Sequence, residues 1–542
     1  MTRVVWAVVA CLAPSVFACS DDSTAADVRA EVADVAPEAA DAVDDIDEIR
    51  ADDATHVDAA VDEVADTAAD VDVTPEIEEP VPLPTVEGLT ELRDDNPDPR
   101  IVEVSLEASE NSVQLAASGK KTKLLNYNHS FPGPLLHARV GDRVIVHFTN
   151  ALTEPTTIHW HGLRISDQMD GSPMIQNPVQ PGETFTYDFV VPDAGTFWYH
   201  THLSQIEQLE RGLYGAIVVH EAAAPVFSAE RIVVADDLRL DATNQVSEFV
   251  LTGHDLMAGR VGNLLLANGK NGVLRATIPR GGIERWRVVL ASNALSFGLR
   301  IRGADVRVIA TDGGLLPTPF ALTRVDIAPG QRYDFEVRPT ATASEVVLEA
   351  LVVVSDASGT ISEQPFALIK STVTGEVVTP EPVYPSVIMP ATTDLPDWME
   401  LLDWKLSAVN VGGKVHFTIN GMSDFVDSDG EFHDHVLLHT FEPNVAVRIK
   451  LTSAISPAHP FHIHGQFFQI IERGGKAVTD EPGLRDTVYL RGAESATILA
   501  YMENPGRWMV HCHIAEHGEN GMMADIQVGP PGGHMHGAPP GQ

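Results

Sequence analysis

The chain has 542 residues and a formal net charge of −41 at pH 7, with 77 acidic against 36 basic side chains. This length suits about three domains of ordinary size, and so acidic a chain argues against binding nucleic acid or an anionic membrane surface through charge. Cysteine occurs only at Cys11, Cys19 and Cys512, which excludes a disulfide framework in the body of the protein.

Residues 1–18 have the features of a secretory signal. Arg3 precedes an apolar run that is too short to span a membrane. The run ends Val16-Phe17-Ala18-Cys19, which resembles a bacterial lipoprotein signal, although Phe17 departs from the small residues usual there. No twin arginine is present, so we expect export of the unfolded chain, with any metal loaded afterwards. The expected location is periplasmic or cell-surface, with a lipid anchor at Cys19; the alternative is an ordinary cleaved signal.

Residues 19–85 are predicted to form an acidic, disordered tether. The segment is rich in Ala, Asp, Val and Glu, and Arg29 and Arg50 are its only basic residues. It carries about half of the net charge of the chain, and such a composition cannot build a hydrophobic core. A solvated spacer is therefore expected, followed by the folded body.

The body, from residue 86 to 529, reads as all-β. Short runs rich in Val, Ile and Phe alternate with Gly, Pro, Asn and Asp turns, and no long stretch keeps a helical period. Three related segments recur in order: a strand-turn-strand unit, a short segment ending near a glycine, and a strand led by glycine. They begin at Ala138, Ile158 and Gly195, at Ala276, Leu295 and Gly330, and at Phe441, Phe461 and Gly506.

This recurrence predicts three consecutive Greek-key β-sandwich domains. We place them at residues 86–225, 226–377 and 378–529, with a disordered tail at 530–542. The first and third copies hold paired histidines at both equivalent positions, and the second copy holds none. If the histidines of the first and third domains bind the same group, they must lie where those two domains meet. The middle domain is then expected to be a spacer that brings the other two together.

Four histidine motifs carry the chemistry of the chain. They are His159-Trp160-His161, His200-Thr201-His202, His459-Pro460-Phe461-His462-Ile463-His464 and His511-Cys512-His513. An HxH pair places two imidazoles on one face of a strand, and in the fourth motif Cys512 would face the opposite way. His517 and Met522 follow. Two imidazoles, a thiolate and a distant thioether are the ligands of an electron-transfer copper.

The order and spacing of these motifs resemble those of three-domain multicopper oxidases of the laccase group, over residues 90–529. The resemblance implies cupredoxin-like domains, four coppers per chain and the four-electron reduction of dioxygen to water. It also implies a role for each ligand. His459, Cys512 and His517 would hold the type 1 copper, with Met522 axial; His159 and His462 would hold the type 2 copper; His161, His200, His202, His464, His511 and His513 would hold the type 3 pair.

Two carboxylates are candidates for proton delivery. Asp170, in Met169-Asp170-Gly171, resembles the aspartate that family members place near the type 2 copper; a turn residue before Gly171 is the alternative reading. Several bacterial relatives carry a proton-transferring glutamate at the position of Gly518. Here the carboxylate lies one residue along, at Glu519.

The leading prediction for the reaction is one-electron oxidation of phenols or aromatic amines, with dioxygen as the partner substrate and a monomeric enzyme. The runner-up is a cuprous or other metal-ion oxidase for copper tolerance, although no methionine-rich run occurs between about 370 and 460. A copper-free scaffold is a third reading, opposed by the complete ligand set. His433, His435 and His439 are expected to lie in an exposed hairpin, with an accessory copper site as the alternative.

Overall fold

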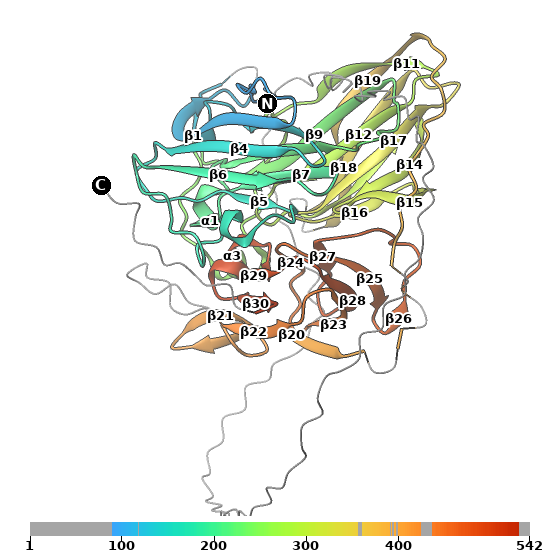
Figure 1. Ribbon diagram of the computed structural model, residues 1–542. Helices are drawn as coiled ribbons and strands as arrows, with labels where there is room; N and C mark the ends of the chain where they lie inside the picture. The colour runs from blue at the N-terminus through green and yellow to red at the C-terminus, as the bar shows by residue number, and fades with distance from the viewer. Residues whose placement is uncertain are drawn as a thin grey trace, which may run out of the picture. The chain divides into compact units, whose positions relative to one another are not determined.

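The computed structural model describes residues 89–530, apart from 117–118, 356–359, 391, 393–394, 397–398 and 424–435. The predicted signal and tether, the predicted tail after residue 530, and His433 and His435 lie outside the described residues. Within the described part, the strands form six sheets, two in each third of the body (Figure 1). The prediction of an all-β, cupredoxin-like architecture is confirmed.

The first two sheets have the strand orders β2-β1-β4-β6 and β3-β8-β7-β5. Their strands are β1 (Ile101–Val113), β2 (Thr122–Tyr127), β3 (Gly133–Arg139), β4 (Arg143–Asn150), β5 (His159–His161), β6 (Thr184–Val190), β7 (Gly195–His200) and β8 (Tyr214–His220). In β4, the alternate side chains of Val144, Val146 and Phe148 are buried, as expected of a strand with one face on a core.

The middle two sheets have the orders β10-β9-β12-β17-β14-β15 and β11-β19-β18-β13-β16. Their strands are β9 (Ala229–Leu238), β10 (Leu264–Ala267), β11 (Leu274–Arg280), β12 (Glu284–Leu290), β13 (Phe297–Arg302), β14 (Ala304–Thr311), β15 (Gly314–Ala321), β16 (Val325–Ile327), β17 (Arg332–Pro339), β18 (Glu345–Ser355) and β19 (Ile361–Glu376).

The last two sheets have the orders β21-β20-β23-β28-β25-β26 and β22-β30-β29-β24-β27. Their strands are β20 (Leu401–Val411), β21 (Lys414–Ile419), β22 (Leu437–Phe441), β23 (Val445–Ser453), β24 (His459–Ile463), β25 (Phe467–Arg473), β26 (Lys476–Ala477), β27 (Thr487–Leu490), β28 (Ser495–Met502), β29 (Gly506–Cys512) and β30 (Met523–Val528).

The helices of the described residues are short. They are the 3-10 turn η1 (Asp167–Met169), α1 (Gln205–Gln208), α2 (Gly253–Ala258) and α3 (Ala515–Glu519). Thr252 and Asp255 form a reciprocal capping box that begins α2. Helix α3 lies against α1 (Figure 1). In the described part, we find no helix with the length and apolar character needed to cross a membrane.

The three copies share a common core of strand pairing, although the first copy has fewer strands in each sheet. Each copy has two parallel pairs between distant strands: β1 with β4 and β3 with β8, β9 with β12 and β11 with β19, and β20 with β23 and β22 with β30. Such parallel pairs require crossovers between the two sheets of a sandwich. The repeat read from the sequence therefore corresponds to a repeated topology.

One part of the predicted repeat is wrong. The glycine-led strands β7 and β29 pair with the motif strands β5 and β24. In the middle copy, the strand that pairs with the equivalent β13 is β18, whereas the strand after Gly330 is β17, which pairs with β12 in the other sheet. A glycine turn before a β-patterned run occurs more than once in each copy, so the pattern alone selected the wrong strand.

Candidate metal centre

The strands bring the paired histidines to one place. Because β5 pairs with β7, His159 lies opposite His200, and because β24 pairs with β29, His462 lies opposite His511. The two pairs of strands come from the first and third copies of the fold. The Nε2 atoms of His202 and His511 lie 3.3 Å apart. Histidines of the first and third copies therefore meet, as the repeat comparison predicted.

A mononuclear group is formed by His459, Cys512 and His517, all fully buried. Cys512 Sγ lies 3.6 Å from His459 Nδ1 and 3.5 Å from His517 Nδ1, and the two nitrogens lie 3.2 Å apart. The centre of such a triangle lies about 2 Å from each corner, which is the usual distance from a transition metal to nitrogen and slightly below that to sulfur. The donor set fits one copper ion.

The backbone of Met522 is hydrogen-bonded to two residues of this group. The Cys512 backbone N–H donates to Met522 O at 3.0 Å, and the Met522 N–H donates to His517 O at 2.9 Å. The Met522 side chain is fully buried in the hydrophobic core of the third copy. Its role as an axial ligand stays a prediction.

A second group contains the other eight predicted histidines. The Nε2 atom of His511 lies 3.3 Å from that of His202 and 3.1 Å from that of His464, so these three imidazoles can share an ion. The ring centres of His161, His200 and His513 lie 5.1 to 5.6 Å from one another. The remaining two members of the group are His159 and His462, whose ring centres lie 5.8 Å apart.

Hydrogen bonds to one ring nitrogen turn the other toward the interior of this cluster. The Nδ1 atoms of five of its imidazoles donate to oxygen at 2.7 to 3.0 Å: His159 to Asp170 O, His200 to Thr201 O, His462 to Asp486 O, His511 to Cys512 O and His464 to Asp170 Oδ2. The Nε2 atoms of His159, His200 and His462 are buried without a partner. Buried unpaired nitrogens that converge are what a metal cluster requires.

The electrostatics also suit metal ligation. Burial lowers the pKa of His513 to about 3 and that of His517 to about 4, and it holds the pKa of His200, His202 and His511 well below the usual range. These imidazoles are therefore neutral and have a lone pair to offer. Burial raises the pKa of the Cys512 thiol, so its thiolate form needs a cation beside it.

The two predicted carboxylates have different surroundings. Asp170 is 1% exposed and accepts from His464 Nδ1 at 2.8 Å through Oδ2, while its Oδ1 lies 3.3 Å from His159 Nδ1. Glu519 instead accepts the backbone N–H of Ile206 at 2.8 Å, a contact that joins α3 to α1. Burial raises the pKa of Glu519 to about 7. Its part in proton transfer stays a prediction.

Sequence reasoning missed Asp486. This carboxylate is 1% exposed, and its Oδ1 lies 3.2 Å from His161 Nε2, while its backbone carbonyl accepts from His462 Nδ1. Asp486 stands in Leu484-Arg485-Asp486-Thr487, which has no metal-ligand spacing. Only its place before β27, the strand paired with β24, brings it to the cluster, and a single sequence carries no signal for that pairing.

A tryptophan side chain packs against the predicted ligands. The Trp198 ring stacks on His200 with ring centres 4.3 Å apart and lies 5.1 Å from the His161 ring. His439, one of the three histidines expected in an exposed hairpin, lies in strand β22. Its ring centre is 4.5 Å from that of Phe441.

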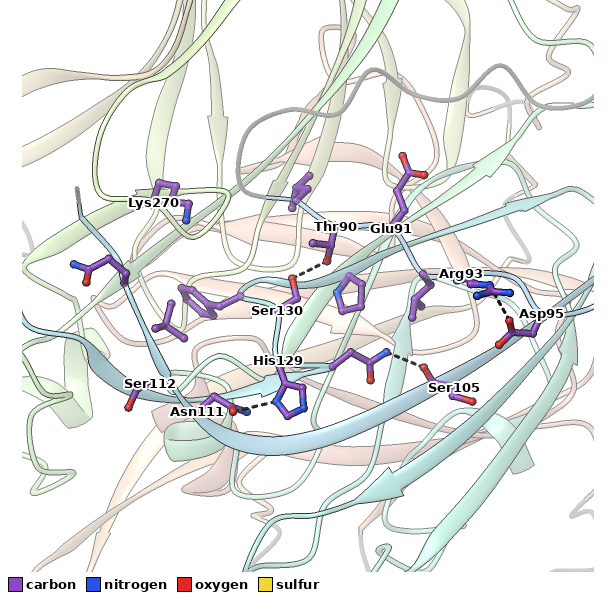
Figure 2. Close-up of a pocket in the computed structure, with 17 residues that line it drawn as sticks. Thr90, Glu91, Arg93, Asp95, Ser105, Asn111, Ser112, His129, Ser130 and Lys270 are labelled. Atoms are coloured by element: carbon purple, nitrogen blue, oxygen red, sulfur yellow. Dashed lines mark hydrogen bonds and ion pairs between the residues drawn. The ribbon is translucent and has the colours of Figure 1, made fainter. Parts of the chain in front are cut away.

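An open cleft elsewhere in the described residues shares no residue with the predicted ligands. It lies over the start of the first copy, and Figure 2 shows Thr90, Ser130 and His129 on its walls. Thr90 Oγ1 donates to Ser130 Oγ at 2.8 Å, and His129 Nδ1 lies 3.0 Å from Asn111 Oδ1. The polar side chains in these two pairs are thus hydrogen-bonded to each other.

The fold and the two groups of ligands define the class of the protein. Family models described as multicopper oxidase match residues 109–224, 232–350 and 409–532. The chain belongs to this family, and it is a three-domain, laccase-like, copper-dependent oxidoreductase that uses dioxygen as acceptor.

Individual relatives agree with this membership. Laccase-1 of Cryptococcus neoformans var. neoformans is 28% identical over 503 residues, covering 77% of this chain and 79% of the relative. A multicopper oxidase from Pseudomonas thermotolerans is 29% identical, with a TM-score of 0.66 over 79% of this chain and 99% of its own. A multicopper oxidase from Campylobacter jejuni, described as a metallo-oxidase, is 26% identical, with a TM-score of 0.70 over 82% and 95%.

Proposed function

We propose that this oxidase holds four coppers and oxidises phenols or aromatic amines, one electron at a time. Cys512 carries the argument. Its thiol belongs to the mononuclear group, while the histidines on either side of it, His511 and His513, belong to the eight-imidazole cluster. The end of strand β29 therefore connects a site suited to one-electron transfer with a site suited to the reduction of dioxygen.

In the proposed assignment each ligand keeps its predicted role. His459, Cys512 and His517 would hold the type 1 copper, with Met522 as its further ligand, and the eight remaining imidazoles would hold the type 2 copper and the type 3 pair. Copper bound in this way supplies one-electron transfer and dioxygen reduction. Oxidation of four phenol molecules releases four electrons and four protons, which balances the conversion of one dioxygen to two waters.

The protein's own part is to orient the ligands and supply protons. Five imidazoles are fixed by their Nδ1 hydrogen bonds, which leaves Nε2 for the metal. Asp170 is the buried carboxylate in contact with two of them, His159 and His464, and in this proposal it holds a proton for the reduced oxygen.

The surroundings of the mononuclear group support an uncharged aromatic donor. The Phe417 ring lies 4.2 Å from that of His517, and Ile514 and Ala294 belong to the same apolar cluster. His517 Nε2 donates to the backbone carbonyl of Met257 in α2 at 3.3 Å. An apolar environment next to the ligands suits an uncharged phenol better than a hydrated cation. The relative named laccase agrees with this choice, and the relative described as a metallo-oxidase keeps Cu(I) as the competing substrate.

Oxygen uptake decides between these substrates. The copper-loaded chain is offered a methoxyphenol and Cu(I) in separate assays at equal electron supply. Much faster uptake with the phenol is expected. Uptake driven mainly by Cu(I) would make the protein a copper-detoxifying oxidase. A Cys512→Ser variant is the matched control for uptake that does not pass through the mononuclear group.

We also propose an exported, lipid-anchored enzyme that acts as a monomer. The support is the sequence Val16-Phe17-Ala18-Cys19 after an apolar run. Metabolic labelling with palmitate in a bacterial host tests the anchor, with Cys19→Ser expected to lose the label and Cys11→Ser expected to keep it. Label retained by Cys19→Ser would refute the anchor, and the sedimentation coefficient of the secreted body tests the monomer.

A further inference from the structure

The middle domain supplies none of the predicted copper ligands, yet it reaches the cluster. Of the five groups of His, Cys, Asp or Glu side chains in the described part that are close enough to share an ion, none includes a residue between 226 and 377. The turn between β16 and β17 nevertheless lies against the imidazoles. Gly330 in this turn has φ +87°, and a Cβ there would lie 3.0 Å from His161 Cε1 and from His513 Cδ2. Main chain of the middle domain is thus in direct contact with ligands of both other domains.

Arg332, two residues on, is fully buried and has every donor occupied. Its Nη1 and Nη2 donate to the two carboxylate oxygens of Asp486 at 2.8 and 2.6 Å. The other three N–H groups donate to the backbone carbonyls of Gly330, Asp312 and Thr196, each at 2.9 Å. A guanidinium has five donors, so this side chain is held rigidly, with partners in all three domains.

Asp486, held in this way, contacts two imidazoles of the cluster. Its Oδ1 lies 3.2 Å from His161 Nε2 and also accepts from Thr487 Oγ1 at 2.9 Å, and its backbone carbonyl accepts from His462 Nδ1 at 2.9 Å. The His161 ring is therefore held by Nε2, and its Nδ1 is the nitrogen buried without a partner. His161 faces the cluster with the opposite nitrogen from its five neighbours that are held by Nδ1.

We propose that Arg332 and Asp486 are positioning residues of the copper cluster. The bidentate pair fixes the carboxylate, and the carboxylate fixes which nitrogen of His161 and which face of His462 meet the metal. The middle domain is then a working part of the cluster rather than a spacer. This role rests on the proposed copper ligation, because it concerns the same imidazoles.

The test compares three variants of the full-length, copper-loaded protein. Arg332→Lys keeps the charge but loses the bidentate fork. Asp486→Asn keeps the size and one acceptor oxygen but loses the charge. Arg285→Lys is the matched control, because Arg285 is also fully buried in the middle domain and donates to Asp334 Oδ2 at 2.9 and 2.7 Å, with no bond to a predicted ligand.

Three readouts separate the two copper groups: copper per chain, the blue absorption of the mononuclear copper, and the electron paramagnetic resonance signal of the type 2 copper. Loss of an outer partner typically weakens metal binding about 10–100-fold. We therefore expect Arg332→Lys and Asp486→Asn to release cluster copper to a chelator about 10–100-fold more readily than the wild type. Their type 2 signals should change while their blue bands persist, and Arg285→Lys should match the wild type.

Two results would overturn the positioning role. The first is that both Arg332→Lys and Asp486→Asn retain copper like the wild type and show an unchanged type 2 signal. The second is that Arg285→Lys loses as much cluster copper as they do. If Arg332→Lys does not fold, the nearly isosteric Asp486→Asn decides alone, with its blue band as the sign of a folded third domain. A wild-type protein with no type 2 signal would refute the copper assignment itself, and that outcome is separate from a failure of the variants.

Discussion

Asp170→Asn would separate the two functions that the geometry gives this carboxylate. Its Oδ2 accepts from His464 Nδ1 at 2.8 Å, and its backbone carbonyl accepts from His159 Nδ1 at 2.9 Å. Asparagine has nearly the same size, its amide oxygen can still accept from His464, and the backbone bond does not depend on the side chain. The substitution therefore preserves the orientation of both imidazoles and removes only the group that can hold and release a proton.

The magnitudes follow from that geometry. A hydrogen bond to a charged group contributes about 1.5–3 kcal/mol and a neutral one about 0.5–1.5 kcal/mol, so the free energy of unfolding should fall by only about 1 kcal/mol. A positioned general acid contributes about 10²–10⁴-fold to a rate. We therefore expect full copper content with an oxygen-reduction rate at least about 10²-fold lower.

Two half-reactions locate the defect. Anaerobic reduction by substrate, followed as bleaching of the blue band, should proceed at the wild-type rate. Reoxidation after oxygen is mixed in should be slow. Asp167→Asn is the matched control, because Asp167 accepts the backbone N–H of Arg507 at 3.0 Å and has no such bond to an imidazole. Wild-type reoxidation in a fully copper-loaded Asp170→Asn protein would show that Asp170 carries no essential proton.

Three other changes have defined outcomes. Cys512→Ser should abolish the blue colour and leave most of the cluster copper in place, since His511 and His513 remain; a variant that stays blue would contradict the type 1 assignment. Met522→Leu should keep that copper and raise its potential, measured by redox titration, because the axial ligand tunes it; complete loss of type 1 copper would rule out a merely axial role. In the metal-free chain, burial lowers the pKa of His513 to about 3 and that of His517 to about 4 from an ordinary 6.5. As the pH falls below about 6.5 the unfolded state takes up these protons first, so the free energy of unfolding should decrease down to about pH 3; urea midpoints at pH 7 and pH 5 that coincide would contradict the buried, neutral state.

The sequence predicted what depends on local alternation. The position of Cys512 between two histidines was enough to separate it from His511 and His513, because neighbouring strand residues face opposite ways. The roles predicted for the other ligands came from the resemblance to multicopper oxidases. The strand assigned to Gly330 was wrong, because a glycine turn before a strand recurs within each copy and does not state which sheet the strand enters.

The parts that sequence could not predict depend on distant partners. Arg332 and Asp486 are 154 positions apart, and Asp486 and His161 are 325 positions apart. Neither Arg332 nor Asp486 has a neighbour in the sequence that marks it as part of a metal site. Their function depends on how the domains pack against one another, and the contacts between domains cannot be predicted from a single sequence.

The mononuclear group and the cluster also differ in how much of the chain must fold before each exists. The two histidines of the mononuclear group are 58 positions apart, whereas cluster contacts span 309 and 325 positions. Closing a longer loop costs more entropy, and contacts between distant residues form slowly. We expect the third domain to acquire its own copper early and the cluster to fill only after the first and middle domains have docked. Blue colour would then report the folding of one domain, and the type 2 signal would report the completed assembly of all three.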